Sequence, residues 1–386
     1  MPQLGAAIRH EWDLDPAFLT VNHGSYGATP RAVLAAEAEW RRRMEAQPTR
    51  FMGHELPKAL RAAAGQLAAF LGGRGDDLVF VENATTGCNA VLRSLDFAPG
   101  DEILVLSHGY GAVIKAARYV ASRTGAKVIY APIPFPRTDD DAVVDSVARS
   151  ITPKTRLAII DHVTSHSALV LPLAAIVAAC HARGVKVLAD GAHGPGNLDL
   201  DVPATGADFY AGNCHKWLNA SKGCAFLWVQ PQHQAGLHPV TISHGYEQGY
   251  LAEFDWTGTR DMSAYLAVTA ALDFHERLGG PALRARNRAL AAEGAALIAG
   301  RLGSETSGGN VAANAMGLVR LPVTGARSQD RANAIRTQLV EAGTDLPINE
   351  VDGAIWLRIS AQAYNEIEDF ERLAKLLRAE LGGQLA

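Results

Sequence analysis

The sequence predicts an α/β fold, in which a large domain with a mainly parallel sheet between helices precedes a smaller C-terminal α+β domain. Over the first 260 residues, short apolar runs alternate with helical stretches of roughly 10 to 15 residues. Near-continuous apolar strands indicate a sheet that helices cover on both faces. From about Ser263 the pattern changes to long Ala/Leu/Arg helices. We therefore expect domains at 1–260 and 261–386, with the N-terminal segment as a candidate to pack on the smaller one.

Two helices are expected before the first strand. Thr29 and Pro30 match an N-cap followed by proline at the first helical position, and this helix runs through Ala46. The second helix runs from about Glu55 to Leu71 and stops at a Gly-Gly pair, which is a common C-terminal signal.

Seven strands then make up the large sheet. They are expected at Leu78–Val81, Ile103–Ser107, Lys127–Ala131, Leu157–Asp161, Val185–Ala189, Asp208–Ala211 and Ala225–Val229, with helices at Ala112–Arg123, Asp141–Ile151 and Leu173–Arg183. The small domain adds strands at Gly317–Leu321 and Ala354–Ser360 and helices from Ser328 and Glu366. Ligands of parallel sheets bind at the carboxyl ends of the strands, so the polar residues there are the candidate site.

Composition and charge exclude several classes of protein. With 36 Lys and Arg against 40 Asp and Glu, the formal charge is −4 and no long single-sign block occurs, which argues against a nucleic-acid binder. The 48% hydrophobic and 20% charged residues match a soluble globular chain and not a disordered one. A chain of 386 residues can bury a large core.

No targeting or membrane segment is expected. The longest apolar stretch, 169–180, has twelve residues and contains Pro172, well short of the roughly 18 that a bilayer span needs. The N-terminus lacks the apolar core of a signal peptide. The four cysteines form no C-x-x-C pair, so they are expected to be buried hydrophobic residues and not metal ligands. We expect a cytoplasmic protein with no membrane partner.

Polar clusters follow three of the expected strands, whereas the usual nucleotide-binding, zinc-protease and serine-hydrolase motifs are absent. Asp190-Gly-Ala-His193 follows one strand, and a carboxylate there needs a cationic or hydrogen-bonding partner. Lys216 lies in a loop after another strand and is either a functional amine or a surface lysine. Thr85 and Thr86 precede an apolar helix, where they are either N-caps alone or part of an anion site.

An amine, a carboxylate and an anion cradle at one sheet edge match the requirements of pyridoxal phosphate. The amine forms a Schiff base with the aldehyde, and the carboxylate keeps the ring nitrogen protonated so that the ring accepts electrons from the substrate Cα. Hydroxyls and backbone N–H groups hold the phosphate. The combination is far more specific than any one cluster.

The chain resembles the class V aminotransferase group of fold type I pyridoxal-phosphate enzymes, and within it the isopenicillin N epimerase-like branch. The resemblance covers nearly the whole sequence. It is carried by Val21-Asn-His-Gly-Ser-Tyr-Gly, Asn83-Ala-Thr-Thr, His215-Lys216-Trp, Trp256-Thr-Gly-Thr, Leu357-Arg358-Ile-Ser and Tyr364-Asn365.

The resemblance implies a role for each matching residue. Lys216 is the lysine that binds the cofactor aldehyde, Asp190 faces the ring nitrogen, and His193 lies near the ring hydroxyl. Positions that bind phosphate in the family are occupied by Thr85, Thr86, Asn213 and His215. Ser165 stands where relatives often carry an Asn, and Tyr110 is the expected stacking ring, with His108 as the weaker alternative.

Further matches concern the substrate and a second subunit. Thr259 lies in a segment that reaches the phosphate of the neighbouring subunit, which implies a homodimer with shared sites. Arg358 matches the arginine that binds the substrate α-carboxylate, a role suited to a bidentate guanidinium, with a domain-bridging salt bridge as the alternative. Asn22 and His23 match a pocket-lining segment. Arg50 is a candidate for a distal carboxylate, and Lys222 is a less favoured alternative to Lys216.

The expected function is a pyridoxal-phosphate enzyme acting at Cα of an amino-acid-like substrate. No cysteine follows Cys224, so a desulfurase that forms a cysteine persulfide is disfavoured. Epimerisation is the first expectation, and C–S β-elimination or transamination is the alternative. Two other classes stay open, an inactive binding protein of the same fold and a nicotinamide dehydrogenase, although the latter lacks its glycine fingerprint. The sequence does not identify the substrate side chain.

Overall fold

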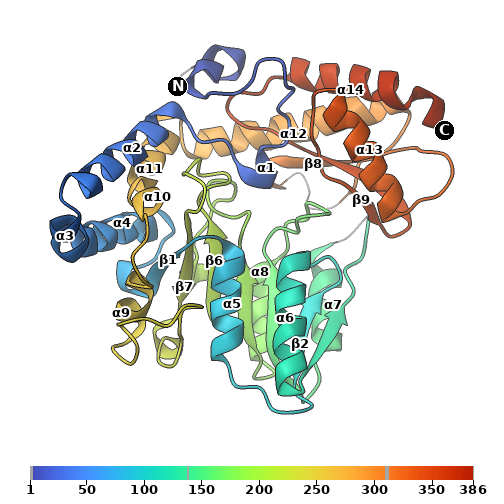
Figure 1. Ribbon diagram of the computed structural model, residues 1–386. Coiled ribbons are helices and arrows are strands. Elements are labelled where there is room, and N and C mark those ends of the chain that lie inside the picture. Colours follow the sequence, from blue (N-terminus) through green and yellow to red (C-terminus); the bar gives the residue numbers. More distant parts are fainter. Residues whose placement is uncertain (1–2, 137–138, 309–312, 386) are drawn as a thin grey trace.

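The computed structural model describes residues 3–136, 139–308 and 313–385. It contains a seven-stranded sheet flanked by helices, and beside it a three-stranded sheet covered by the last long helices (Figure 1). The α/β class with a smaller α+β part is confirmed.

The large sheet has the order β1-β7-β6-β5-β4-β2-β3. Only β7 runs antiparallel to its neighbours, so the sheet is mainly parallel. The strands are β1 (Leu78–Val81), β2 (Glu102–Leu106), β3 (Lys127–Ala131), β4 (Thr155–Asp161), β5 (Lys186–Asp190), β6 (Phe209–Asn213) and β7 (Ala225–Val229). All seven expected strands are present; three have the expected bounds, and the bounds of the other four differ by one or two residues.

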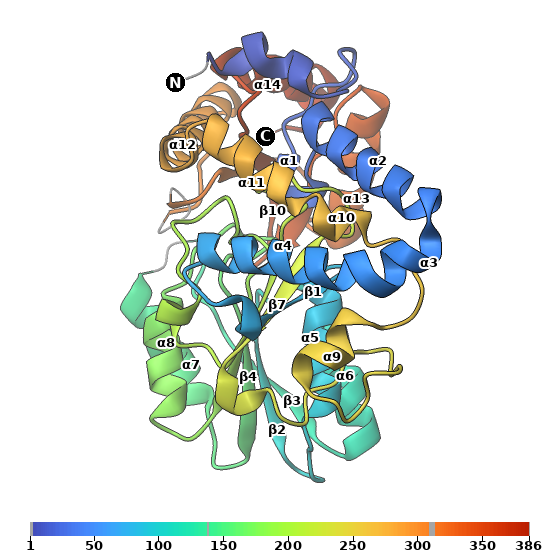
Figure 2. The same ribbon diagram turned by 90° about the vertical axis from the view of Figure 1, so that its left-hand side faces the viewer.

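Apolar cores cover both faces of this sheet, because alternate strand residues point to opposite faces. Val79 and Val81 of β1 pack in one core with α5 (Ala84–Ser94), α6 (Gly111–Thr124) and α9 (Tyr250–Asp255). Leu78 and Phe80 pack in the other core with α4 (Leu56–Phe70), α7 (Asp140–Ser150) and α8 (Leu173–His181). Figure 2 shows α4 lying across one end of the large sheet, in contact with α11 (Val268–Arg277).

The small sheet is antiparallel, with the order β8-β10-β9. It consists of β8 (Met316–Arg320), β9 (Ile348–Val351) and β10 (Ala354–Ser360), and it packs with α12 (Pro281–Leu302), α13 (Gln329–Glu341) and α14 (Ile367–Leu381). Strand β9 was not expected, because Ile-Asn-Glu-Val has only four residues and two of them are polar. It forms by pairing with β10 across the turn at Asp352 and Gly353.

The N-terminal segment lies against the small sheet. The Gly5 N–H donates to the Ala363 carbonyl (2.7 Å), and the Ser360 N–H donates to the Val21 carbonyl (2.8 Å). The chain then forms α1 (His23–Tyr26), α2 (Arg31–Ala46) and α3 (Pro48–Arg50) before a π-helical turn leads into α4. The division at residue 260 stays a prediction, since the segment that starts the chain packs on elements that end it.

The expected cap of α2 was wrong in detail. Pro30, in an extended conformation, occupies the N-cap position and offers no side-chain hydrogen bond. The Thr29 hydroxyl instead donates to the Ala220 carbonyl (3.3 Å), so it joins the helix start to the loop after β6. A short helix, α10 (Ser263–Leu266), precedes α11.

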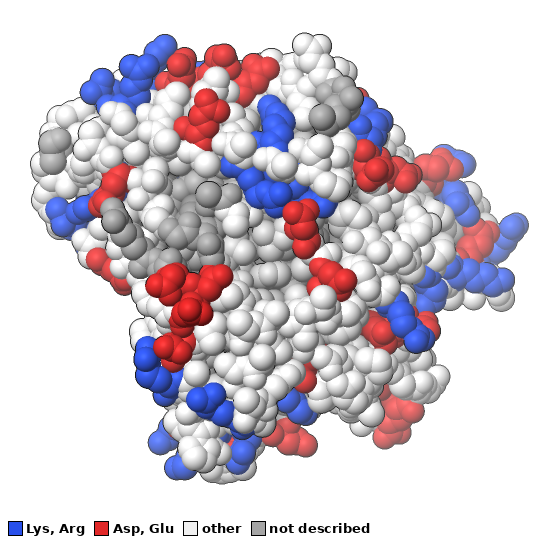
Figure 3. Space-filling model, turned by 180° about the vertical axis from the view of Figure 1, so that it is seen from behind, with Lys and Arg blue, Asp and Glu red and all other residues white. Residues whose placement is uncertain are grey.

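The surface and the helices carry two further observations. On the face seen in Figure 3, Lys and Arg side chains are interspersed with Asp and Glu, and no continuous basic field covers that face. Within the described ranges, no helix is both long enough and apolar enough to cross a bilayer.

Candidate active site

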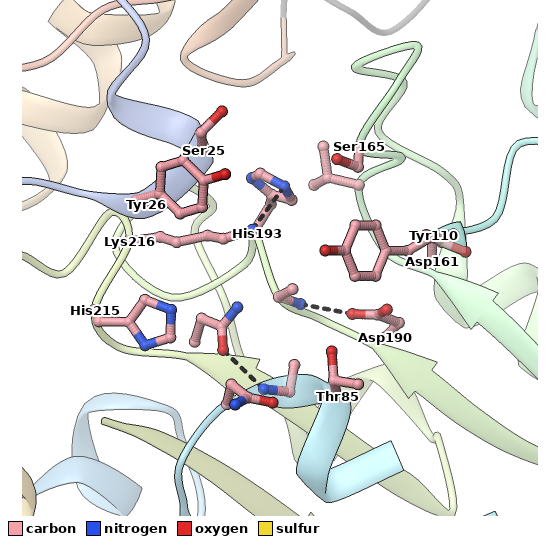
Figure 4. A pocket seen from close by; sticks show the side chains of 15 residues that line it. Ser25, Tyr26, Thr85, Tyr110, Asp161, Ser165, Asp190, His193, His215 and Lys216 are labelled. Carbon is pink, nitrogen blue, oxygen red and sulfur yellow. Dashed lines mark hydrogen bonds between the residues drawn. The ribbon is translucent and has the colours of Figure 1, made fainter. Parts of the chain in front are cut away.

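A cavity of about 390 Å³ opens at the carboxyl ends of β4, β5 and β6, beside the N-terminus of α5. This volume falls within the range of roughly 300 to 1,000 Å³ typical of small-molecule sites. Figure 4 shows its lining side chains, with Lys216 and Tyr26 on one side and Tyr110 and Asp161 on the other. The lining residues are Ser25, Tyr26, Asn83, Ala84, Thr85, Tyr110, Asp161, Val163, Ser165, Asp190, Ala192, His193, Asn213, His215 and Lys216.

Lys216 lies in the turn after β6, and its amine contacts a histidine. Its Nζ is 3.1 Å from His193 Nε2, while Trp217 Nε1–H donates to His193 Nδ1 (3.2 Å). A neutral imidazole that accepts at Nδ1 carries its proton on Nε2. His193 Nε2–H therefore donates to the Lys216 nitrogen, and this arrangement requires an uncharged amine.

The electrostatics of the site shift the Lys216 amine toward the same uncharged state. Burial, and after it the Arg358 charge, lowers the pKa of Lys216 from its ordinary value to about 8, while the Asp190 charge opposes the shift. Burial also holds the pKa of His193 well below its usual value, so the imidazole is neutral. A lysine with this pKa is a nucleophile near neutral pH, as a carbonyl cofactor requires.

Asp190 ends β5 and is only 3% exposed. Its Oδ1 accepts the Ala192 N–H at 3.1 Å, and burial raises its pKa while the Lys216 charge lowers it. No lysine, arginine or histidine nitrogen within the described part of the chain reaches ion-pairing distance of this carboxylate. A buried carboxyl that faces a cavity without a cation fits the protonated ring nitrogen of pyridoxal phosphate.

The N-terminus of α5 forms the floor of the cavity. Its N-cap is Asn83, whose side chain accepts the Thr86 N–H (2.9 Å), so the N-cap role considered for Thr85 and Thr86 was wrong. The Ala84 N–H donates to Asn213 Oδ1 at 2.8 Å, which ties the helix start to β6. Thr85 lines the cavity, but Thr86 does not. A helix N-terminus with a nearby hydroxyl fits a phosphate group.

His215 lines the cavity beside this helix start. Its Nδ1 donates to the Cys224 carbonyl (3.0 Å), and burial lowers its pKa to about 4. Nε2 is the other ring nitrogen, and a bound phosphate would favour protonation there because it brings a negative charge.

Arg358 lies on β10 and is 2% exposed. Its guanidinium donates to the Ser165 carbonyl (2.5 Å) and to Ser25 Oγ (3.1 Å), and both residues line the cavity. No carboxylate of the described chain is within ion-pairing distance, so the alternative of a domain-bridging salt bridge was wrong. Burial lowers the pKa of Arg358 to about 10, and a substrate carboxylate would supply the missing negative charge.

The N-terminal segment supports the site on the side of Lys216 (Figure 4). Asn22 Oδ1 accepts from Ser25 Oγ at 2.8 Å and lies 3.5 Å from an Arg358 nitrogen. His23 is buried, with Nδ1 2.9 Å from the Tyr364 hydroxyl and Nε2 3.0 Å from the Lys216 carbonyl oxygen. These two residues hold the lining groups in place and do not line the cavity themselves.

Three other candidates lie away from the cavity lining. Arg50 is exposed and pairs with Glu55 (3.0 Å). Thr259 is exposed, and its role in a neighbouring subunit stays a prediction. The Lys222 amine lies 3.3 Å from the Thr29 hydroxyl, and the chain brings Lys216 and not Lys222 to the cavity.

The geometry also separates the two candidate stacking rings. Tyr110 lines the cavity, whereas His108 is buried and bonds Ser167 Oγ through Nδ1 (2.9 Å). Sequence reasoning did not single out three lining residues, Ser25, Tyr26 and Asp161. The first two lie in the motif after Val21, and Asp161 ends an apolar strand just as Asp190 does, so the same signal was present for it.

A family model, "Aminotransferase class-V", matches residues 26–373. The chain belongs to the class V aminotransferase family. It is 35% identical to a protein named putative L-cysteine desulfhydrase 1 from Oryza sativa subsp. japonica, over 95% of this chain and 84% of the relative. It is 34% identical to isopenicillin N epimerase from Streptomyces clavuligerus, over 96% of both chains.

A solved structure confirms the fold. A C-DES variant with glycine covalently linked to its PLP cofactor has a TM-score of 0.82 and 24% sequence identity, over 95% of this chain and 98% of that one. Membership in the class V aminotransferase family and the cavity chemistry together confirm an enzyme whose cofactor is pyridoxal phosphate.

Proposed function

We propose that the enzyme removes the Cα proton of an amino acid whose carboxylate binds Arg358, and that it epimerises that carbon. The observation that carries this proposal is the buried Arg358 guanidinium, which has hydroxyl and carbonyl contacts but no carboxylate in the described chain. Arg358 does not itself line the cavity, but Ser25 and Ser165, which it contacts, line it together with Lys216. A carboxylate that reached Arg358 from the cavity would set the amino group of the substrate on the side of the Lys216 amine.

The residues that line the cavity would have separate roles in binding the cofactor and in moving the proton. Pyridoxal phosphate, when bound, supplies an aldehyde that links to amines and a ring that withdraws electrons from Cα. Asp190 would hold the ring nitrogen, and Thr85, Asn213 and His215, which also line the cavity, would hold the phosphate. The free Lys216 amine would accept the Cα proton at Nζ, and a pKa of about 8 suits that role near neutral pH.

Epimerisation needs a second proton-carrying group across the cavity from Lys216. Two phenols line the cavity, but Tyr26 lies on the side of Lys216, whereas the Tyr110 hydroxyl points toward the middle of the cavity from the other side (Figure 4). Tyr110 comes from the wall opposite Lys216. This arrangement favours return of the proton to the other face of Cα.

Incubation with single amino acids in deuterated water tests the reaction. Deuterium at Cα together with loss of optical purity is the expected result. Formation of the pyridoxamine form of the cofactor, with a keto acid and no racemised amino acid, would contradict epimerisation and indicate transamination. An enzyme inert to every amino acid tested, yet loaded with cofactor, would support the inactive binding protein.

The lysine assignment has its own experiment with a matched control. Borohydride should fix the cofactor on Lys216, and the Lys216→Ala protein should yield no fixed adduct. Lys222→Ala should keep the adduct, because that amine lies outside the cavity. A fixed adduct on Lys222 in wild-type protein would refute the assignment.

C–S β-elimination is the second candidate, and the rice relative named a putative L-cysteine desulfhydrase favours it. Release of pyruvate or a related keto acid and sulfide from L-cysteine would support it over epimerisation. A persulfide route through a cysteine of this chain is disfavoured. The four cysteines are buried, and none of them lines the cavity; they are Cys88, Cys180, Cys214 and Cys224.

We also propose a cytoplasmic homodimer with shared sites. Free buried cysteines support a reducing compartment. The exposed Thr259 and the exposed apolar residues Val240, Ile242 and Tyr246 support a subunit interface. Light scattering should give twice the chain mass, and mixing inactive Lys216→Ala with a Thr259 variant should restore activity in hybrid dimers.

A further inference from the structure

Asp161 is a second buried carboxyl in the cavity, and the proposed function leaves it without a role. It ends β4, where it pairs in parallel register with Asp190 of β5, and it is 4% exposed. Burial and the neighbouring Asp190 raise the pKa of Asp161 well above its ordinary value. No cationic side chain in the described ranges forms an ion pair with it. A charge partner therefore does not explain its position.

One hydrogen bond joins Asp161 to the cavity wall. Its Oδ1 accepts the backbone N–H of Tyr110 at 3.0 Å. Tyr110 is also the N-cap residue of α6, and its side chain makes no capping bond. At Gly109, a Cβ would lie 3.0 Å from the Leu106 carbonyl oxygen and 3.3 Å from Asp161 Oδ2, so the turn packs closely on the carboxyl.

The two acids have parallel geometries but serve different loops. Asp190 Oδ1 accepts the Ala192 N–H (3.1 Å) and holds the loop that leads to His193. Asp161 holds the turn that leads to Tyr110. Tyr110 is 39% exposed, and among the described residues no side-chain hydrogen bond fixes its hydroxyl. The position of this ring therefore depends on its backbone.

We propose that Asp161 is a positioning residue, whose carboxyl oxygen accepts the Tyr110 N–H and so fixes the Tyr110 ring on the cavity wall. It acts as a hydrogen-bond acceptor and not as a charge. This inference rests on the proposed function in one respect, namely that Tyr110 faces the cofactor and the substrate.

Two isosteric variants separate the acceptor from the charge. Asp161→Asn keeps an oxygen that accepts the N–H, whereas Asp161→Leu keeps the volume and removes the acceptor. Hydrogen exchange by mass spectrometry on cofactor-free protein reports the bond directly. The peptide that contains Tyr110 should exchange about tenfold faster in Asp161→Leu, since one buried hydrogen bond is lost, and Asp161→Asn should restore protection.

Cofactor binding gives the second readout. Asp161→Leu should raise the Kd for pyridoxal phosphate about tenfold and weaken the visible circular dichroism of the bound cofactor. In a Tyr110→Ala background the same change should alter the Kd less than twofold, because the ring that Asp161 positions is already absent. Thermal unfolding of each cofactor-free protein checks that the fold is kept.

The possible failures are distinct. Asp161→Asn that behaves like Asp161→Leu would show that the charge matters and overturn the proposal. Additive effects of Asp161→Leu and Tyr110→Ala would overturn it as well. If wild-type protein bound no cofactor at Lys216, the proposed function would fail, while the exchange experiment would still decide the hydrogen bond. Unchanged exchange in an Asp161→Leu protein would refute the positioning role by itself.

Discussion

Trp217 controls the protonation state of the lysine beside it, and Trp217→Phe isolates that control. The substitution keeps an aromatic ring in the buried position but removes the N–H that His193 Nδ1 accepts at 3.2 Å. Nothing then forces the imidazole proton onto Nε2. Nε2 becomes free to accept from a charged Lys216 ammonium, which is a stronger hydrogen bond than the neutral one. The Lys216 pKa should therefore rise.

The size of the effect follows from one hydrogen bond. Its net worth of about 1 kcal/mol corresponds to a change in the Lys216 pKa from about 8 to nearly 9. At pH 7 the uncharged fraction of the amine would fall from about one in ten to between roughly one in fifty and one in a hundred. Because only the uncharged amine attacks the cofactor aldehyde, cofactor capture at pH 7 should slow about five- to tenfold.

The assay mixes cofactor-free protein with pyridoxal phosphate between pH 6 and pH 10 and follows visible absorbance. Wild-type capture should rise with a midpoint near pH 8, and the Trp217→Phe midpoint should lie higher. Trp12→Phe is the matched control, since Trp12 is also buried and donates to the Ala28 carbonyl at the same 3.2 Å. An unmoved midpoint in Trp217→Phe, or an equal shift in Trp12→Phe, would refute the reasoning.

Two further predictions concern substrate binding and the turn at Gly27, which packs against the loop that carries Lys216. Arg358→Ala should raise KM for the amino acid about 10- to 100-fold, because a charged hydrogen-bonded contact is lost. Arg286 is the control, since its guanidinium donates to the Gln362 and Asn365 carbonyls, and Arg286→Ala should change KM little. Equal KM values in steady-state kinetics would reject the carboxylate role. Gly27→Ala should destabilise the fold by roughly 2–4 kcal/mol. Gly27 has φ +71°, and a Cβ there would collide with the carbonyl oxygen that precedes Lys216, while Gly53→Ala meets open space. Equal melting temperatures of these two variants would contradict that account.

Much of the fold and the centre of the site could be predicted because their signals are local. A buried parallel strand reads as an apolar run, and a charged residue at its end is visible without any tertiary knowledge, as with Asp190. Lys216 could be identified as a candidate from its position in the loop after the next strand. Asp161 gave the same signal as Asp190, and the structure was needed to show that both carboxyls reach one cavity.

The remaining features depend on how the backbone folds locally and not on residue type or spacing alone. Strand β9 is polar at two of four positions and exists through its pairing with β10. The N-cap of α5 is Asn83, because the backbone is still extended at this residue and its side chain accepts the Thr86 N–H. Arg50 was a candidate for a distal substrate carboxylate. Its ion pair with Glu55 spans a π-helical turn, which the sequence spacing did not predict.

The N-terminal segment and β10 meet beside the loop that carries Lys216. Val21 accepts the Ser360 N–H, the Gly24 N–H donates to Ser360 Oγ (3.0 Å), and His23 lies 3.0 Å from the Lys216 carbonyl oxygen. A nascent polypeptide thus cannot form these contacts until β10 has left the ribosome. Cofactor capture is accordingly a late event of biosynthesis, and fragments that stop before residue 354 should be colourless even when their large sheet has formed.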